Sequence, residues 1–264
     1  MNLIIDIGNT RAKLFTFSGE QLVDYTTCNH DLAELPHFIE KNNCKHGILS
    51  TTSGLTKEAE QHIEMLPFKV LHMTGTTPTP VNILYHTPHT LGTDRLAAIV
   101  AAQDIKPECD ILVIDCGTCV TYDFLDAQGN YWGGNISPGL EMRLKAMHQL
   151  TARLPLVNSE GDLPEVGYDT QTAIRNGAIW GLRHEIDGYI RQFQKKFNAL
   201  SVFLTGGDAK KLGMSEESCI FAGAKIGYSS EKAEQDLAFR SDCTIFVDDF
   251  VVPRGLNLIL NYNK

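Results

Sequence analysis

The sequence predicts two related α/β domains, and three observations support this prediction. The first is an internal repeat, because residues 3–10 (LIIDIGNT) are echoed by residues 112–119 (LVIDCGTC). The second is the alternation of short apolar runs with helical patterns, which is typical of mixed sheets covered by helices. The third is the length of 264 residues, which suffices for two compact domains. A repeat of this length that occurs only twice indicates duplicated domains, since a solenoid would show three or more copies.

Each copy of the repeat opens with a strand, a tight turn and a second strand. The apolar run before the Asp reads as a strand buried on both faces, and the glycine-containing tip reads as a hairpin turn. Pro78 and Pro80 predict a loop, because both residues disfavour a helix. The pattern along the rest of the first half predicts a helix near 31–40, a strand at 47–50, a helix near 56–65, a strand at 68–71 and a helix from about 92 to 102.

The second half repeats this order. Two hairpins extend through residue 137, and Pro138 is expected in the first turn of the helix that follows. A long helix between about 170 and 197 carries one apolar stripe, which includes Leu182 and Ile186. A strand at 202–205 then runs into a pair of glycines.

The C-terminal part is less regular. The stretch from about 213 to 245 is ambiguous, and we predict only a helix at 231–240 within it. We place the domain boundary near residue 106, which gives domains at 1–106 and 107–264.

Composition excludes several classes of protein. The chain has 23 Lys and Arg against 32 Asp and Glu, and this net charge of −9 argues against a nucleic-acid partner. No apolar run is long enough for a membrane helix, and the N-terminal residues do not resemble a signal peptide. The seven scattered cysteines suggest reduced thiols, so we expect a cytoplasmic protein without a membrane partner.

The two strand–turn–strand tips predict phosphate binding. Glycine lets the backbone approach a ligand closely, and successive N–H groups at such turns can hold an anion. Asp6 and Asp115 are then placed to hold a hard cation that bridges phosphate oxygens, and Lys13 can neutralise charge during transfer. A single Asp-Gly tip would be ordinary turn chemistry, but two matching copies and the glycine pair at 206–207 favour a phosphate site. The chain has neither a Walker-type loop nor the usual dinucleotide motif.

Five motifs then make the chain resemble a known family, the type III pantothenate kinases. Two of the motifs, DIGNTRAK and DCGT, are shared across the acetate kinase/sugar kinase/Hsp70/actin superfamily. LGTDRLAA and WGGNISPG are specific to a much narrower group of proteins. The resemblance covers nearly the whole chain and implies two duplicated ribonuclease H-like domains with mixed sheets flanked by helices. The motifs lie at residues 6–13, 115–118, 91–98, 132–139 and, for LTGGD, 204–208.

The family resemblance implies ATP-dependent phosphorylation of the primary hydroxyl of pantothenate, the first step towards coenzyme A. It implies Mg²⁺ with ATP and a monovalent cation (K⁺ or NH₄⁺) held by Asp115, and the turn chemistry above makes Asp6 a candidate magnesium ligand. Asp94 matches the catalytic base. The implied ATP-binding residues are Asp6, Ile7, Gly8, Asn9, Thr10, Arg11, Ala12, Lys13, Thr118, Gly206 and Gly207. The implied pantothenate-binding residues are Tyr85, Gly92, Thr93, Asp94, Arg95 and Thr170.

Thr170 matches a threonine that reaches pantothenate from the partner subunit, so the resemblance also implies a homodimer. Thr172 is an open alternative, because local register alone does not separate the two threonines. From the residues alone, Asp94 reads more readily as a helix cap, and Tyr85 reads equally as a half-buried aromatic residue.

Other signals and functions stay open at this point. Cys116 and Cys119 have redox or zinc spacing but lack a second pair, and we expect His86 and His89 to be solvent-exposed rather than metal ligands. Another small-molecule kinase of the same superfamily and a nucleotide-binding regulatory module are the alternative functions.

Overall fold

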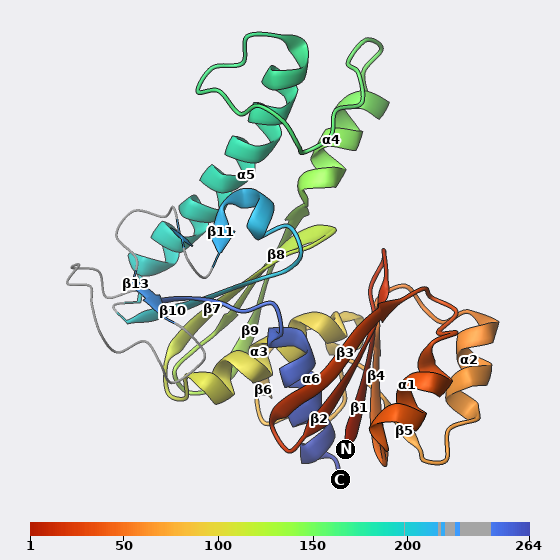
Figure 1. The fold of residues 1–264 in the computed structure, drawn as a ribbon. Coiled ribbons are helices and arrows are strands. Elements are labelled where there is room, and N and C mark those ends of the chain that lie inside the picture. The colour runs from red at the N-terminus through yellow and green to blue at the C-terminus, as the bar shows by residue number, and fades with distance from the viewer. Residues whose placement is uncertain (198, 216–217, 220–224, 228–243) are drawn as a thin grey trace. The chain divides into compact units, whose positions relative to one another are not determined.

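The computed structural model describes residues 1–197, 199–215, 218–219, 225–227 and 244–264 (Figure 1). The chain divides into two compact units. The first unit contains residues 1–105, 129–131 and 250–264, and the second contains 106–128 and 132–249. The main break between the two units falls between residues 105 and 106, and the C-terminal segment belongs to the first unit.

The first unit is built on a five-stranded sheet with the order β3-β2-β1-β4-β5. Its first three strands are antiparallel, and β4 and β5 extend the sheet in parallel to β1. In Figure 1, α1 and α2 lie on one side of this sheet and α3 and α6 on the other. The strands are β1 (Asn2–Ile7), β2 (Ala12–Ser18), β3 (Gln21–Cys28), β4 (His46–Thr51) and β5 (Val70–His72); the helices are α1 (Leu35–Asn42), α2 (Lys57–Glu64), α3 (Thr93–Ile105) and α6 (Val251–Tyr262).

Alternation along β1 sorts its side chains between the two faces of the sheet. Leu3, Ile5 and Ile7 pack in the core that also holds α1 and α2, so Ile4 and Asp6 point to the opposite face. A short strand, β6 (Asn82–Ile83), and a single 3-10 turn, η1 (Pro88–Thr90), connect β5 to α3. The alternation thus directs Asp6 towards the side of the sheet that α3 covers.

The second unit repeats the strand order of the first. Its strands run β9-β8-β7-β10-β14, which corresponds position by position to β3-β2-β1-β4-β5. This correspondence confirms the internal repeat and the predicted fold class of two mixed α/β sheets flanked by helices. The strands are β7 (Asp110–Cys116), β8 (Cys119–Leu125), β9 (Asn130–Pro138), β10 (Leu200–Thr205), β13 (Lys225–Gly227) and β14 (Thr244–Val247), with a short pair β11 (Met214–Ser215) and β12 (Ser218–Cys219).

In its described segments the second unit has two helices, of which the first packs against the second and the second contacts strands β7 and β10 of the sheet. These are α4 (Leu140–Gln149) and α5 (Thr170–Gln194), and a 3-10 turn, η2 (Lys210–Leu212), follows β10. The predicted stripe on α5 is confirmed, because Leu182 and Ile186 are fully buried against the sheet. Beyond β9, the last strand of this sheet is β6, which pairs with residues 130–131 at the start of β9. Both β6 and residues 130–131 belong to the first unit.

The structure corrects three details of the sequence prediction. Helix α1 begins at Leu35 rather than near residue 31, because Leu32 has a positive φ of 56° and Pro36 occupies the first turn. Pro138 does not lie in the first turn of α4: it ends β9, and Gly139 is the N-cap. Helix α5 ends at Gln194, short of residue 197. The helix predicted at 231–240 lies outside the described residues.

Close packing explains why the C-terminal helix joins the first unit. A Cβ on Gly255 of α6 would lie 1.8 Å from the Ala97 carbonyl oxygen of α3, so only glycine allows this approach. Asn257 is buried and accepts a hydrogen bond from the Asn2 amide at 2.7 Å, and its own amide donates to the Gly19 carbonyl at 2.9 Å. These hydrogen bonds and this close packing attach α6 to both α3 and β1.

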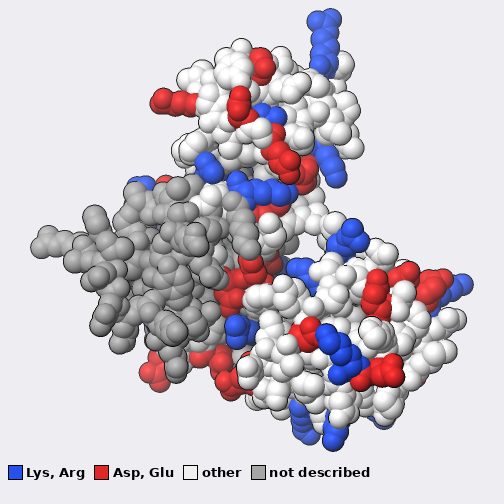
Figure 2. Space-filling model, in the orientation of Figure 1, with Lys and Arg blue, Asp and Glu red and all other residues white. Residues whose placement is uncertain are grey.

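Surface and side-chain properties of the described residues complete the fold. None of their helices is long and apolar enough to cross a membrane. Acidic and basic side chains are interspersed over the face shown in Figure 2, which carries no continuous basic stripe on its described part. The thiols of Cys28, Cys44, Cys109, Cys116 and Cys119 are free.

Candidate active site

In the first unit, sheet register brings three polar side chains into one row. Asp6 near the end of β1 lies opposite Lys13 on β2 and opposite Ser50 on β4. Residues directly opposite one another on neighbouring strands point to the same face, so the three side chains are neighbours. The Ser50 hydroxyl lies 2.8 Å from the Thr93 hydroxyl in a buried contact, which ties this row to the start of α3.

Asp6 carries the most perturbed carboxyl group of this row. Burial raises its pKa from 3.8 to about 6, the Lys13 ammonium opposes that rise, and the nearby Asp94 carboxylate adds to it. A hydrogen bond from Ser50 has a smaller lowering effect on the same pKa. A partly buried carboxyl with a second carboxyl close by is a site that a cation would stabilise.

The first turn of α3 presents Asp94 beside this row. Its Oδ1 accepts the backbone N–H of Arg95 at 2.8 Å, and a Cβ on Gly92 would lie only 2.6 Å from the same oxygen. The positive end of the helix dipole favours an ionised carboxylate at this position. Glycine at position 92 therefore leaves room for Asp94 to adopt this conformation.

Arg95 and Tyr85 are also brought together in the first unit. The Arg95 guanidinium lies 5.8 Å from the centre of the Tyr85 ring, and Tyr85 in turn stacks on Tyr131 with ring centres 6.5 Å apart. Arg95 is buried and Tyr85 half-buried. His86 and His89 are exposed, as expected.

The first predicted phosphate loop is a tight turn at residues 8–11. The Gly8 N–H donates to the Arg11 carbonyl at 3.1 Å, and the Gly8 carbonyl is held by His30 Nε2 at 2.8 Å and by the Ser53 hydroxyl at 3.3 Å. Within the loop, the Asn9 and Thr10 side chains are exposed.

The residues that flank this loop differ in what they present to a ligand. The side chains of Ile7 and Ala12 are fully buried, so those two residues offer only their backbone. Lys13 and Arg11 are exposed, and Arg11 donates to the Asn29 side chain at 2.9 Å.

In the second unit, three segments distant in the sequence converge on the turn between β7 and β8. Gly117 and Thr118 form this turn, which the Gly117 N–H closes on the Cys119 carbonyl at 3.0 Å. Gly206 has a φ of +97°, and a Cβ there would lie 2.4 Å from Asp115 Oδ1. The Gly139 N–H donates to the Thr118 carbonyl at 3.2 Å.

These approaches place the predicted groups of the second unit together. Asp115, the turn at 117–118 and the glycine pair at 206–207 are neighbours, and the Asp208 N–H fixes the pair by donating to the Cys116 carbonyl at 2.9 Å. Thr118 is exposed at the tip, where its hydroxyl is accessible to a ligand.

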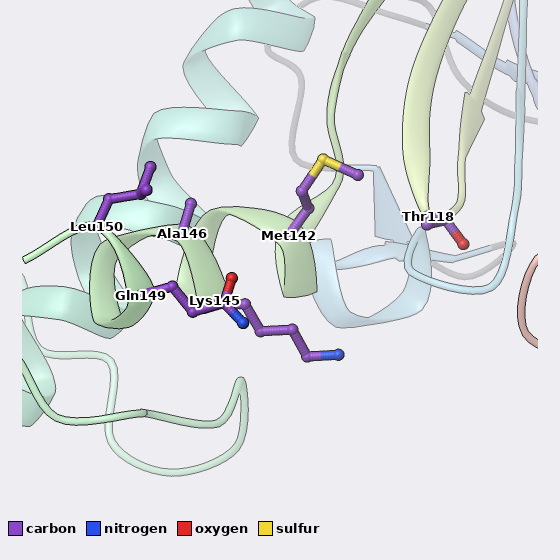
Figure 3. A pocket seen from close by; sticks show the side chains of 6 residues that line it. All are labelled: Thr118, Met142, Lys145, Ala146, Gln149 and Leu150. Carbon is purple, nitrogen blue, oxygen red and sulfur yellow. The ribbon is translucent and has the colours of Figure 1, made fainter.

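A pocket of about 300 Å³ adjoins Thr118 (Figure 3). One face of α4 lines it, and Lys145 is its cationic side chain. Sequence reasoning missed this face, although the spacing of its residues along a helix was a usable signal. The lining residues are Thr118, Met142, Lys145, Ala146, Gln149 and Leu150.

The start of α5 distinguishes the two candidate threonines. Thr172 is buried in a capping box, where its N–H and hydroxyl bond the Asp169 carboxylate at 2.8 and 2.7 Å. Thr170 is exposed in the first turn. The hydroxyl of Thr172 is thus engaged within the chain.

Sequence reasoning missed other residues that support the site. Ser50 could have been found, because it lies at the end of a predicted strand that pairs with β1. His30 and Ser53, which hold the first loop, left no signal in their local patterns. Among the described residues, no cluster of three or more His, Cys, Asp or Glu side chains forms a metal site.

Comparison with known proteins finds relatives that match the whole chain. A type III pantothenate kinase from Phocaeicola vulgatus is 46% identical over 264 residues, covering 100% of this chain and 99% of the relative. One from Cytophaga hutchinsonii is 34% identical over 264 residues and covers 100% of both chains.

Solved structures share the fold at low identity. A Baf family protein from Campylobacter jejuni has a TM-score of 0.58 at 20% identity and covers 99% of this chain and 98% of its own. The ethanolamine utilization protein EutJ from Carboxydothermus hydrogenoformans has a TM-score of 0.51 at 14% identity and covers 97% and 89%. A model of the family described as type III pantothenate kinase matches residues 2–192. The chain therefore belongs to the type III pantothenate kinase family.

Proposed function

We propose that this chain transfers the γ-phosphoryl group of ATP to the primary hydroxyl of pantothenate, giving 4'-phosphopantothenate and ADP, the first step of coenzyme A biosynthesis. Family membership supports the reaction, and one observation supports the location of the chemistry. The row Asp6–Lys13–Ser50 lies beside the Asp94 carboxylate at the start of α3. Phosphoryl transfer requires mainly positioning and neutralisation of charge, and these groups supply both.

Asp94 is proposed as the catalytic base. In the transfer, the bond from the pantothenate oxygen to phosphorus forms while the bond from phosphorus to the ADP oxygen breaks. The hydroxyl proton passes to the Asp94 carboxylate. The hydrogen bond from the Arg95 N–H to Asp94 Oδ1 helps to orient the carboxylate towards the substrate hydroxyl.

Asp6, Lys13 and the first loop are proposed to receive the phosphate end of MgATP. Mg²⁺ is held in such sites by one or two carboxylates together with substrate phosphates, and the raised pKa of Asp6 beside Asp94 fits a site completed by a cation. Magnesium supplies charge neutralisation on the phosphates. Lys13 offers a further positive charge, and the exposed Asn9 and Thr10 offer hydrogen-bond donors.

The second unit is proposed to hold the nucleotide through Thr118 and the glycine pair at 206–207. Asp115 is proposed to hold K⁺ or NH₄⁺, since its carboxylate lies against the backbone of Gly206. A hard monovalent cation prefers oxygen ligands, which a carboxylate and nearby carbonyls provide.

Arg95 and Tyr85 are proposed to bind pantothenate. A guanidinium can form two parallel hydrogen bonds to the substrate carboxylate, and its position over the Tyr85 ring orients it. Gly92 and Thr93 complete this block. Thr170 rather than Thr172 is proposed as the substrate contact, because the capping box engages the Thr172 hydroxyl.

Since Thr170 is expected to reach the active site of a partner subunit, we also propose a homodimer. Large apolar side chains support this assembly, because they are exposed at the end of α4 and along the connection to α5. Their exposed fractions are 84% for Leu150, 59% for Leu156, 78% for Val166 and 68% for Tyr168. We further propose a cytoplasmic location, in keeping with the free thiols of the described segments.

The decisive experiment measures ADP release with ATP and Mg²⁺, with and without pantothenate and with and without K⁺. Turnover that requires pantothenate and falls without K⁺ or NH₄⁺ supports both the reaction and the cation. ATP consumption that ignores pantothenate would point to another small-molecule kinase, and nucleotide binding without turnover would point to a regulatory module. Asp94→Asn should abolish turnover and retain nucleotide binding, and unchanged turnover would remove Asp94 from the mechanism.

A further inference from the structure

Glu185 in the middle of α5 lies in a polar cluster that the reaction does not directly require. Its Oε1 accepts hydrogen bonds from the Tyr122 hydroxyl at 2.8 Å and from the Ser137 hydroxyl at 2.5 Å. Its Oε2 accepts from the Arg143 guanidinium. One carboxylate thereby joins α5 to β8, β9 and α4.

The hydrogen-bond donors of this cluster stabilise the ionised form of Glu185. Burial alone would raise the pKa of Glu185, but the Ser137, Arg143 and Tyr122 donors outweigh it and hold that pKa below its ordinary value. Burial and the neighbouring carboxylate raise the pKa of Tyr122, whose ring also stacks on Tyr189 with centres 3.9 Å apart. Glu185 is therefore an anion near neutral pH, and Tyr122 stays a donor.

Arg143 connects this anion to the junction between β9 and α4. Its Nε donates to the Pro138 carbonyl at 2.8 Å, and its terminal nitrogen also bonds the Ser137 hydroxyl at 3.2 Å. The next residue, Gly139, is the N-cap of α4. The guanidinium fork thus fixes the backbone where the chain enters the helix.

This junction in turn supports the turn between β7 and β8. The Gly139 N–H donates to the Thr118 carbonyl at 3.2 Å. A Cβ on Gly139 would lie 2.3 Å from the Gly117 carbonyl oxygen and 2.4 Å from that of Thr118, so the two segments are in direct backbone contact. The hydrogen bond and this close approach couple the position of Thr118 to that of Gly139.

We propose that Glu185 is a positioning residue for nucleotide binding: by orienting Arg143, it holds the junction at residues 137–139 against the turn Gly117–Thr118. The inference rests on the proposed role of that turn in binding ATP. Stability alone does not require this cluster, since an ion pair between partly exposed side chains contributes little to stability. Oε2 of Glu185 accepts from one terminal nitrogen of Arg143, while Oε1 is held by Tyr122 and Ser137, so the carboxylate is fixed in a position that orients the guanidinium.

The test compares variants of the full-length protein by the Kd for ADP and by the KM values for ATP and pantothenate. Glu185→Gln leaves either an amide N–H₂ or an uncharged oxygen in contact with the Arg143 guanidinium, so the charged hydrogen bond is lost. This variant should raise the Kd for ADP and the KM for ATP about tenfold. The KM for pantothenate should change less than about twofold. Arg143→Lys should give an intermediate loss, because one ammonium cannot bond Glu185 and the Pro138 carbonyl with the fork geometry of arginine.

Two further variants act as matched controls. Tyr122→Phe keeps the ring stack and leaves Glu185 with two donors, so its effect should be about twofold or less. Asp187→Asn removes an exposed ion pair to Arg191 on the same helix, with an N–O distance of 2.6 Å, and should leave all three constants unchanged. Circular dichroism verifies that each variant is folded, and Arg143→Lys decides the matter if Glu185→Gln does not fold.

The outcomes separate this inference from the function on which it rests. Thr118→Val should also weaken ADP binding; if it does while Glu185→Gln and Arg143→Lys do not, the positioning role is overturned and the turn keeps its function. If Thr118→Val leaves ADP binding unchanged, the assignment of the turn fails and the inference fails with it. Equal rises in both KM values for Glu185→Gln would indicate a general structural role and would also overturn the proposal.

Discussion

Replacing Asp6 by Asn should make the protein more stable and inactive at the same time. Asp6 is partly buried near the end of β1, and its carboxyl has a pKa of about 6 instead of 3.8. Near neutral pH the folded chain therefore keeps an ionised group in a place that disfavours charge. Asn has nearly the same shape and carries no charge, so it should remove this cost while losing the proposed contact to MgATP.

The magnitude follows from the two pKa values. One pKa unit corresponds to 1.36 kcal/mol, so a change from 3.8 to about 6 destabilises the fold by up to about 3 kcal/mol once Asp6 is ionised. The folded state binds the proton more tightly than the unfolded state, so stability falls as pH rises from about 4 through about 6. Asp6→Asn should match the parent protein below about pH 4 and exceed it by up to about 3 kcal/mol above about pH 7.

The assay must report on the first unit. Both tryptophans, Trp132 and Trp180, belong to the second unit, so their fluorescence is the wrong probe. Hydrogen exchange of the amides in β1 and β4, without nucleotide or magnesium and over a range of pH, gives the local free energy of opening. Turnover of the same samples tests the catalytic loss.

Asp24→Asn is the matched control, because it should show the opposite dependence on pH. Hydrogen bonds from Lys41 and Asn42 lower the pKa of Asp24, so its carboxylate stabilises the fold above about pH 4 and loses that effect as pH falls. The Asn variant should therefore be less stable near neutral pH and unchanged in acid. A gain for Asp6→Asn that did not depend on pH, or a loss near neutral pH, would refute the electrostatic reasoning.

Three further predictions concern the glycine pair at 206–207, the two threonines of α5 and Arg95. Gly206→Ala should lower the free energy of unfolding by about 2–4 kcal/mol in thermal or urea unfolding, because its Cβ would lie 2.4 Å from Asp115 Oδ1 at a φ of +97°. A Cβ on Gly207 would meet no atom within 4 Å, so Gly207→Ala should cost less than about 0.5 kcal/mol. Thr172→Ala should lose the capping box and about 1 kcal/mol of stability. Thr170→Ala should raise the KM for pantothenate several-fold without a change in melting temperature. The reverse pattern would exchange the roles of the two threonines. Arg95→Lys should raise the KM for pantothenate about tenfold with little change in the KM for ATP, both measured by steady-state kinetics. A KM for pantothenate equal to that of the parent protein would contradict the proposed contact with the substrate carboxylate.

Local patterns were sufficient for most of the fold. The repeat of an apolar run, Asp and Gly predicted the two hairpins, and the strand order of the second sheet confirmed the duplication. The apolar stripe on α5 predicted its buried face, because helical periodicity is encoded in neighbouring residues. The start of α1 and the place of Pro138 were missed, since a positive φ at Leu32 and the extra length of β9 depend on tertiary packing.

The sequence alone determined which residues are available for chemistry, whereas the tertiary structure decided which of them meet. Asp6, Asp94 and Asp115 are conspicuous in their motifs, but Ser50 joins the row of Asp6 and Lys13 only because β1 pairs with β4, a strand distant in the sequence. The perturbed pKa of Asp6 and the cluster around Glu185 arise from burial and from partners that no local pattern specifies. Periodicity and turn chemistry act over a few residues, whereas electrostatics and close backbone approach depend on distances that exist only in the folded chain.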